Sequence, residues 1–258
     1  IYNKKELKNT IRAAFKKTSI LKTEVLFSYT FKIDADFNTI KSNILNEDEM
    51  FYFSLPKNEN QFIGKGNLIK HVNNEVLDIF KYTVVSNLKN NEDTLFTFNI
   101  SAFDQDRKTG KPWVGIPRNK FIIPKILLQK NKKITLNEII NLKQNQETFL
   151  YNIEKIIRIL SKKSKFNHKQ IKLNEGKTIP GKNEYLNTIT NAVLGIKNSK
   201  LEKTVLSKIE KHKIDSKLNI HKIINNMEEK YDECFNFFIK LNKEDSFFGS
   251  SPEIILKK

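Results

Sequence analysis

Residues 247–253 of the chain read Phe-Phe-Gly-Ser-Ser-Pro-Glu, and the apolar run Ile-Ile-Leu follows at 254–256. The two apolar runs indicate β-structure over 246–257, with a bend at the glycine and proline between them. Bends inside sheets often turn a side chain into a functional site, and apolar surroundings favour the protonated form of a carboxyl group. Glu253 is therefore a candidate general acid. The alternative is a hairpin turn that carries an exposed carboxylate.

A second candidate segment is Lys-Thr-Val-Leu-Ser-Lys at 203–208. Its pattern predicts a strand over 203–210, on which Lys203, Val205 and Ser207 share one face. A lysine beside a valine is partly desolvated, which favours the neutral amine that a general base requires. Lys203 is therefore a candidate general base, and an ordinary lysine at a strand edge is the alternative.

The rest of the chain carries more strand patterns than helix patterns, joined by short connections. This order favours an α+β fold with layered, mainly antiparallel sheets and flanking helices over a regular βαβ alternation. A Lys- and Asn-rich stretch over 162–181 predicts a long surface loop between an N-terminal part, 1–161, and a C-terminal part, 182–258. Helices are expected at 3–18, 146–163, 183–197 and 217–231, and strands at 49–56, 60–65, 94–103, 203–210, 234–241 and 246–257, with an apolar run at 121–128 that Pro124 interrupts.

The charge of the chain raises a nucleic-acid hypothesis. Its 258 residues include 46 Lys plus Arg against 29 Asp plus Glu, a net charge of +17. The arginines are few, however: Arg12, Arg107, Arg118 and Arg158. Proteins that read bases or grip phosphates rely on the planar guanidinium group, and the lysines here are scattered. A solvated surface is the favoured interpretation, with no nucleic-acid partner, and a basic RNA-binding module remains an alternative.

Other features of composition bound the class of protein. Apolar residues make up 38% of the chain, which suffices for a packed core. No apolar run approaches the roughly 18 residues of a membrane span, so no membrane partner is expected. The single cysteine, Cys234, cannot form an internal disulfide, and Ile1 is not followed by a visible signal peptide. These features favour a reducing, cytoplasmic setting, and the oligomeric state stays open with a monomer favoured.

Taken together, the segments at 203–208 and 247–253 resemble those of the chorismate-utilising enzymes, and within them the isochorismate synthases. Those enzymes carry a Lys-Val-Val-Leu-Ala/Ser-Arg strand and a Phe-x-Gly-Ala-Ser/Thr-Pro-Glu segment. Thr204 and Lys208 depart from the first pattern, where the family has Val and Arg. The helix that begins near Glu184-Tyr185 is similar to a family helix, and Phe103-Asp104, Trp113 and Phe121–Pro124 are similar more loosely.

The resemblance implies an isomerase that converts chorismate to isochorismate for menaquinone or siderophore biosynthesis. Lys203 would activate a water that attacks C2, and Glu253 would protonate the departing C4 hydroxyl. The lysine implies a water nucleophile, because relatives that install an amine usually have Gln there. A salicylate synthase, which goes on to eliminate pyruvate, is the alternative within the family.

The resemblance also implies that the printed chain is an incomplete domain. Family members continue for more than a hundred residues past the Ser-Pro-Glu segment, and that portion supplies a Gly-Thr-x-Arg substrate loop and the glutamates that bind Mg²⁺. The expected cofactor is therefore Mg²⁺, with ligands beyond Lys258 and none in this chain. The substrate-binding residues stay unknown, and the fragment alone is expected to be inactive.

Overall fold

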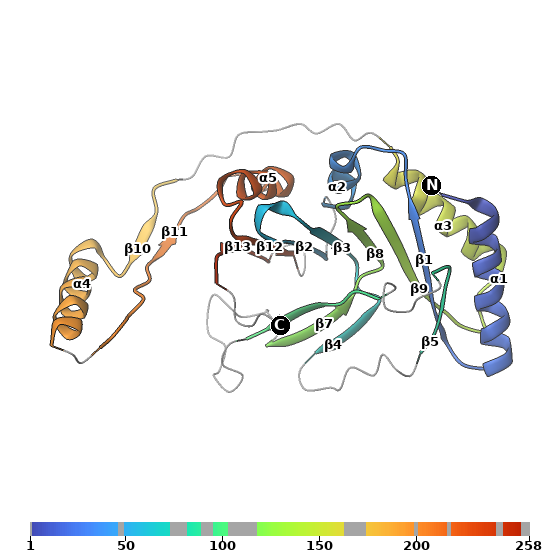
Figure 1. The fold of residues 1–258 in the computed structure, drawn as a ribbon, viewed down its shortest axis with the longest axis horizontal. Helices are drawn as coiled ribbons and strands as arrows, with labels where there is room; N and C mark the ends of the chain where they lie inside the picture. Colours follow the sequence, from blue (N-terminus) through green and yellow to red (C-terminus); the bar gives the residue numbers. More distant parts are fainter. Residues whose placement is uncertain are drawn as a thin grey trace. The chain divides into compact units, whose positions relative to one another are not determined.

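A computed structural model describes the protein over nine ranges of residues (Figure 1). The described residues form two units, one made of 1–165 and 220–258 and the other of 166–219. We call them unit 1 and unit 2. The first boundary falls within the predicted loop at 162–181. The described ranges are 2–45, 49–72, 82–88, 95–102, 118–162, 174–198, 201–215, 218–240 and 245–253.

Unit 1 is built on an eight-stranded sheet with the order β13-β12-β2-β3-β8-β9-β1-β5. All neighbours in it are antiparallel except β1 and β5, which are parallel. The fold class predicted from the sequence is therefore confirmed. The strands are β1 (Val25–Lys32), β2 (Met50–Ser54), β3 (Gln61–Lys65), β5 (Thr83–Ser86), β8 (Ile126–Gln129), β9 (Lys133–Ile140), β12 (Phe235–Lys240) and β13 (Ser246–Ser251).

A second, three-stranded sheet of unit 1 has the order β4-β7-β6, formed by β4 (Ile69–Val72), β6 (Phe98–Ser101) and β7 (Asn119–Ile123). Pro124 separates β7 from β8, so the apolar run of the sequence divides between two sheets. The buried Asn137 holds this break, because its side-chain amide donates a hydrogen bond to the Pro124 carbonyl at 2.9 Å. A proline that interrupts a strand pattern thus marks a change of sheet.

Four helices of unit 1 supply side chains to one hydrophobic core with the large sheet: α1 (Lys4–Leu21), α2 (Phe37–Leu45), α3 (Gln146–Leu160) and α5 (Ile220–Lys230). Asn3 caps α1 and Asn145 caps α3, each accepting hydrogen bonds from two amides of the first turn. The core contains aromatic rings from β1 as well as aliphatic side chains from all four helices. Burial of this apolar surface is the main force that holds helices on the sheet.

The connection between β2 and β3 is a short 3-10 helix, Pro56–Asn58, and the two strands correspond to those expected at 49–56 and 60–65. The two strands pair with Tyr52 opposite Ile63, and β12 pairs on the other side with Phe238 opposite Tyr52. All three of these side chains are buried in the core. The sheet therefore joins segments near residues 52 and 238 of the chain.

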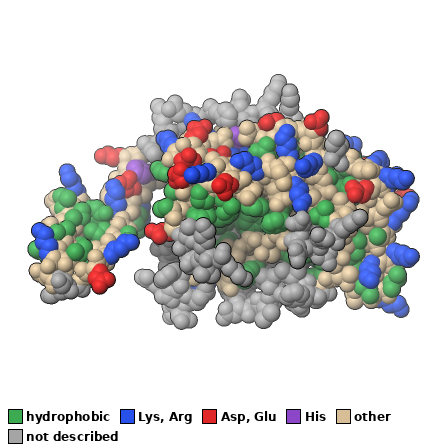
Figure 2. Space-filling view, in the orientation of Figure 1, with side chains coloured by type: hydrophobic (Ala, Val, Ile, Leu, Met, Phe, Trp, Pro, Cys, Tyr) green, Lys and Arg blue, Asp and Glu red, His purple; other side chains and the backbone are tan. Residues whose placement is uncertain are grey.

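Unit 2 contains the helix α4 (Lys182–Lys197) and a two-stranded ribbon of β10 (Lys177–Ile179) and β11 (Ile209–Lys211). No residue of α4 is buried. Five of its large apolar side chains are exposed: Leu186, Ile189, Val193, Leu194 and Ile196. In Figure 2 the hydrophobic side chains gather visibly on the face of this unit.

The helix and strand predictions agree with the structure for most elements, and one of them is wrong. Residues 203–208 form no regular strand, and β11 begins only at Ile209. A strand requires a hydrogen-bonded neighbour, and β10 pairs only with 209–211 among the described residues of unit 2. The sequence patterns also gave no sign of α2 or of the strands β1, β4, β5, β9 and β10, although β1 and β9 lie next to each other inside the large sheet. The strand β10 lies within the stretch 162–181 that was expected to be a surface loop, so that expectation is wrong at 177–179.

Candidate active site

Glu253 lies two residues beyond the edge strand β13, whose last residue is Ser251. Its side chain is exposed, and its backbone amide donates a hydrogen bond to the Ser251 hydroxyl at 3.2 Å. The Ser-Pro-Glu segment is therefore a strand end with a local serine turn. The apolar surroundings expected around the carboxylate are not found among the described residues, which end at Glu253 in this part of the chain. Its role as a general acid stays a prediction.

The glycine of the same segment has a packing reason. Gly249 lies opposite Phe237 in the pairing of β12 with β13. A Cβ atom at Gly249 would come within 2.9 Å of the Phe237 ring. A side chain there would force that ring to move, so this position favours glycine. The ring of Phe237 also contacts Phe247, with 5.3 Å between the ring centroids.

Asn236, the residue before Phe237, is fully buried and joins β13 to the turn that follows α5. Its side-chain amide donates to the Tyr231 carbonyl at 3.0 Å and lies 3.5 Å from the Cys234 carbonyl oxygen. Its side-chain oxygen accepts a hydrogen bond from the Ser250 hydroxyl. The resembling family pattern has Ala at the position of Ser250, so this contact belongs to the present sequence.

Lys203 lies in unit 2, in the irregular segment between α4 and β11, and its side chain is exposed. Glu253 belongs to unit 1, so the two predicted catalytic residues lie in different units. Farther along the segment, Lys208 forms an ion pair with Glu210 at 2.6 Å, and this contact raises the pKa of Lys208. The role of Lys203 as a general base stays a prediction.

The other segments of the resemblance divide between the described and undescribed residues. Glu184 and Tyr185 lie in the first turns of α4, and residues 121–124 comprise the end of β7 and the proline that follows it. Phe103-Asp104 and Trp113 lie outside the described residues.

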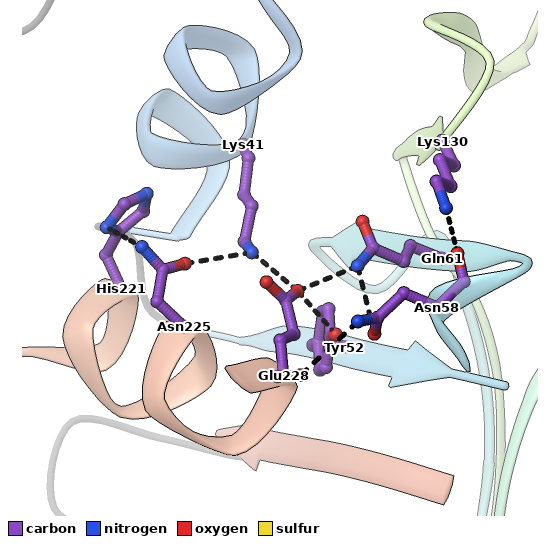
Figure 3. A network of polar contacts seen from close by, with 8 residues as sticks. All are labelled: Lys41, Tyr52, Asn58, Gln61, Lys130, His221, Asn225 and Glu228. Atoms are coloured by element: carbon purple, nitrogen blue, oxygen red, sulfur yellow. Dashed lines mark hydrogen bonds and ion pairs between the residues drawn. The ribbon is translucent and has the colours of Figure 1, made fainter. Parts of the chain in front are cut away.

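Sequence reasoning missed a buried ionic network between α2, α5 and the strands β2 and β3 (Figure 3). Lys41 of α2 has only 1% of its side chain exposed, and its ammonium group lies 2.6 Å from the carboxylate of Glu228 on α5. The same carboxylate oxygen accepts hydrogen bonds from the Tyr52 hydroxyl at 2.6 Å and from the Gln61 amide at 2.9 Å. Asn225 accepts a further bond from Lys41 at 3.1 Å. One carboxylate thus ties a helix to two strands and a second helix.

The electrostatics of this network follow from its burial. Desolvation lowers the pKa of Lys41, and the nearby carboxylate of Glu228 partly offsets that effect. Burial, together with the same carboxylate, raises the pKa of the Tyr52 hydroxyl above its ordinary value. The ammonium group also lies 5.5 Å from the centre of the Tyr52 ring, within cation–π range. We interpret the network as the anchor of α5, since its hydrogen bonds tie this helix to α2, β2 and β3.

A cavity of about 420 Å³ lies on the β2, β3 and β12 part of the large sheet, beside the segment 96–100. Its volume falls in the range of small-molecule sites. A dicarboxylate would need cationic groups or several hydrogen-bond donors, and none of the described lining side chains is charged. The lining residues are Phe51, Tyr52, Phe53, Phe62, Phe96, Thr97, Phe98, Asn99, Ile100, Phe237 and Ile239.

The described residues do not provide a magnesium site. No group of three or more His, Cys, Asp or Glu side chains that could hold a metal ion occurs among them. The residues present therefore do not fit Mg²⁺ by themselves, and the cofactor stays a prediction. In the described part of the chain, none of the helices combines the length and apolar character needed to cross a membrane.

The fold has a counterpart among solved structures. It is similar to the structure of MenF, the menaquinone-specific isochorismate synthase from Escherichia coli, with a TM-score of 0.60 and 15% sequence identity over 95% of this chain. A putative 2,3-dihydroxybenzoate-specific isochorismate synthase, DhbC from Bacillus anthracis, matches over 83% of the chain with a TM-score of 0.48 and 14% identity. The chain spans 56% of the MenF chain and 47% of the DhbC chain.

The sequence itself matches the family model described as chorismate binding enzyme over residues 10–258. The chain therefore belongs to the chorismate binding enzyme family. No curated protein matches the sequence. Both predicted catalytic residues, Lys203 and Glu253, lie within the matched range.

Proposed function

We propose that the whole protein to which this chain belongs is an isochorismate synthase. The observation that carries the proposal is the family match over 10–258, which includes both Lys203 and Glu253. The similarity of the fold to that of MenF is consistent with this proposal. The proposed activity is an isomerase reaction on chorismate, in the cytoplasm, for menaquinone or siderophore biosynthesis.

The proposed chemistry is an exchange of one hydroxyl group for another. Lys203 removes a proton from a water molecule, whose oxygen then bonds to C2 of chorismate. The ring double bonds shift, the C4–O bond breaks, and Glu253 donates a proton so that the C4 hydroxyl leaves as water. One water is consumed and one is released, so the product is an isomer of the substrate. This division of roles requires a neutral amine and a protonated carboxyl group at the start of each turnover.

The proposal assigns each role from the sequence motif to which the residue belongs. Lys203 and Glu253 are exposed, each on a segment outside regular secondary structure. Exposed side chains on such segments can reach a ligand that binds against them. Mg²⁺, if bound by residues outside those described, would supply the positioning and polarisation of the substrate carboxylate.

The test is conversion of chorismate to isochorismate by the whole protein in the presence of Mg²⁺, followed by chromatography. Lys203→Ala and Glu253→Gln should each lower kcat by roughly 10²–10⁴-fold, the usual contribution of a general base or acid. Lys197→Ala and Glu233→Gln are matched controls, because both residues are exposed and neither has a proposed role. Near-normal turnover in either test variant would overturn its assigned role.

Further measurements test the alternatives and the need for Mg²⁺. Release of pyruvate together with salicylate would show a salicylate synthase. Removal of Mg²⁺ by a chelator should abolish turnover, and added Mg²⁺ should restore it. Tight RNA binding at physiological salt, with no reaction of chorismate, would instead support a basic binding module.

A further inference from the structure

The end of β13 is hydrogen-bonded to Asn236, a residue that has no role in the proposed chemistry. Asn236 of β12 has none of its surface exposed. It lies opposite Ser250 in the pairing with β13 and opposite Ser54 in the pairing with β2. Within a sheet interior, an amide side chain is costly unless its polar atoms find partners. Asn236 meets this condition through contacts to two separate segments.

The first contact is with the turn between α5 and β12. The Tyr231 carbonyl accepts hydrogen bonds both from the Asn236 side chain, at 3.0 Å, and from the backbone amide of Cys234, at 3.1 Å. The turn begins at the C-terminal end of α5, whose residue Glu228 is bound to Lys41, Tyr52 and Gln61. Asn236 therefore contacts a part of the chain that is already fixed to the core of unit 1.

The second contact reaches the Ser-Ser-Pro-Glu segment. The hydroxyl of Ser250 donates to the Asn236 side-chain oxygen, which fixes Ser250 against β12. The next residue, Ser251, accepts a hydrogen bond from the backbone amide of Glu253 at 3.2 Å. Two successive serine hydroxyls thus constrain the backbone on the way to Glu253, one from across the strand pair and one from within the turn.

We propose that Asn236, acting through Ser250, is a positioning residue for Glu253. The inference rests on the proposed function, in which Glu253 is the general acid. A general acid must lie within hydrogen-bond reach of the leaving oxygen, and a misplacement of about 1 Å can cost up to roughly 100-fold in rate. Glu253 lies two residues beyond the end of β13, so strand pairing alone does not fix it.

The experiment measures kcat and KM of the whole protein for chorismate in a set of serine variants. Ser250→Ala removes the hydroxyl that reaches Asn236 and makes little other change, so the fold is retained. It should lower kcat by about tenfold while KM changes less than about twofold, because the hydroxyl acts on the acid and not on substrate binding. Ser250→Thr keeps the hydroxyl and should restore most of the rate. Ser246→Ala is the matched control, since Ser246 is an exposed serine of the same strand.

Asn236→Ala tests the other partner of the bond. It should lower kcat at least as much as Ser250→Ala does. The double variant should have a kcat little lower than that of Asn236→Ala alone, because both substitutions break the same hydrogen bond between Ser250 and Asn236. Hydrogen exchange measured on a peptide covering 246–253 should increase in both single variants and stay unchanged in Ser246→Ala.

Glu253→Gln distinguishes failure of this inference from failure of the proposed function. If Glu253→Gln loses activity while Ser250→Ala matches Ser246→Ala in kcat, the positioning role is wrong and the function stands. The role is also wrong if Ser250→Ala lowers the rate and Ser250→Thr does not restore it. If Glu253→Gln retains activity, the general-acid assignment fails, and the positioning role fails with it.

Discussion

The Lys41–Glu228 pair allows a sharp prediction about stability, because its two partners differ in exposure. Lys41 has 1% of its side chain exposed and Glu228 has 16%. Replacing Glu228 with Gln keeps the shape of the side chain but leaves the buried ammonium group without its counter-charge. Breaking a buried pair in this way costs about 3–5 kcal/mol. Asn225 still accepts one bond from Lys41, so we expect a loss of about 3 kcal/mol in the free energy of unfolding.

The reverse change should cost less. Lys41→Met removes the buried cation and leaves a partly exposed carboxylate that still accepts hydrogen bonds from Tyr52 and Gln61. The loss should be about 1–2 kcal/mol, the cost of one charged hydrogen bond in a partly solvated place. In the Glu228→Gln variant the ammonium group of Lys41 is a buried charge without a counter-charge. Adding Lys41→Met to that variant removes this charge, so the double variant should regain part of the lost stability.

The assay is urea unfolding at pH 7, followed by circular dichroism, with the slope of each transition compared among the variants. Equal slopes would show that the midpoints report stability. The reasoning is refuted if Lys41→Met costs more than Glu228→Gln, or if the double variant is less stable than Glu228→Gln alone. Lys4→Met is the matched control, because the lysine of the Lys4–Glu154 pair is largely exposed and its loss should change the stability less than either change at the buried pair.

Three further predictions concern single positions. The raised pKa of Tyr52 means that its contribution to stability is complete below pH 10 and is lost as the pH rises above 10, since the unfolded chain releases that proton first. Tyr52→Phe should therefore flatten the alkaline side of a plot of melting temperature against pH. A plot with an unchanged alkaline side would contradict this prediction. Gly64→Ala places a Cβ atom 2.7 Å from the Phe98 ring and 3.1 Å from Pro124, so it should lower the free energy of unfolding in urea by about 1–3 kcal/mol. An unchanged free energy of unfolding would show that the ring moves aside freely. Asn145→Ala removes the cap of α3 and should cost about 1 kcal/mol, a loss that Asn145→Asp should largely avoid in the same assay.

The sequence predicted well those elements whose pattern is local. The helical spacing of Phe149, Ile153, Ile157 and Leu160 corresponds to the buried face of α3. The turn at Pro56 and the proline at 124 also lie where two strands end. In each case a side-chain period or a missing backbone donor acts within a few residues, so the signal is present in the sequence itself.

The strands β1 and β9 were harder to predict, because every residue of β1 except the last is buried. A strand buried on both faces lacks the alternation that marks a half-exposed one. The strand expected over 203–210 is missing at 203–208 for the opposite reason: the alternation is present, but no neighbour pairs with 203–208 among the described residues of unit 2. Pairing is a property of the folded chain and leaves no local signal.

Some of the polar residues described above could be predicted from the sequence, and others could not. Glu253 and Lys203 could be proposed because each belongs to a short motif with a recognisable resemblance. Lys41 and Glu228 could not, because 187 positions separate them and neither lies in a motif. A lysine in the buried stripe of a short helix, beside Ile40 and Ile44, is the one local sign that a distant carboxylate was needed.

Unit 1 consists of two pieces of chain, and unit 2 lies between them in sequence. This arrangement constrains the order of events during synthesis. The strand β2 and the helix α2, which contact β12 and α5, are synthesised early, yet β2 keeps an open edge until residues 235–240 have been synthesised. Open strand edges are sites of aggregation, and pairing between such distant segments is slow. We therefore expect a nascent chain that ends within unit 2 to need protection of the β2 edge, and β12 and β13 to be the last strands that complete the large sheet.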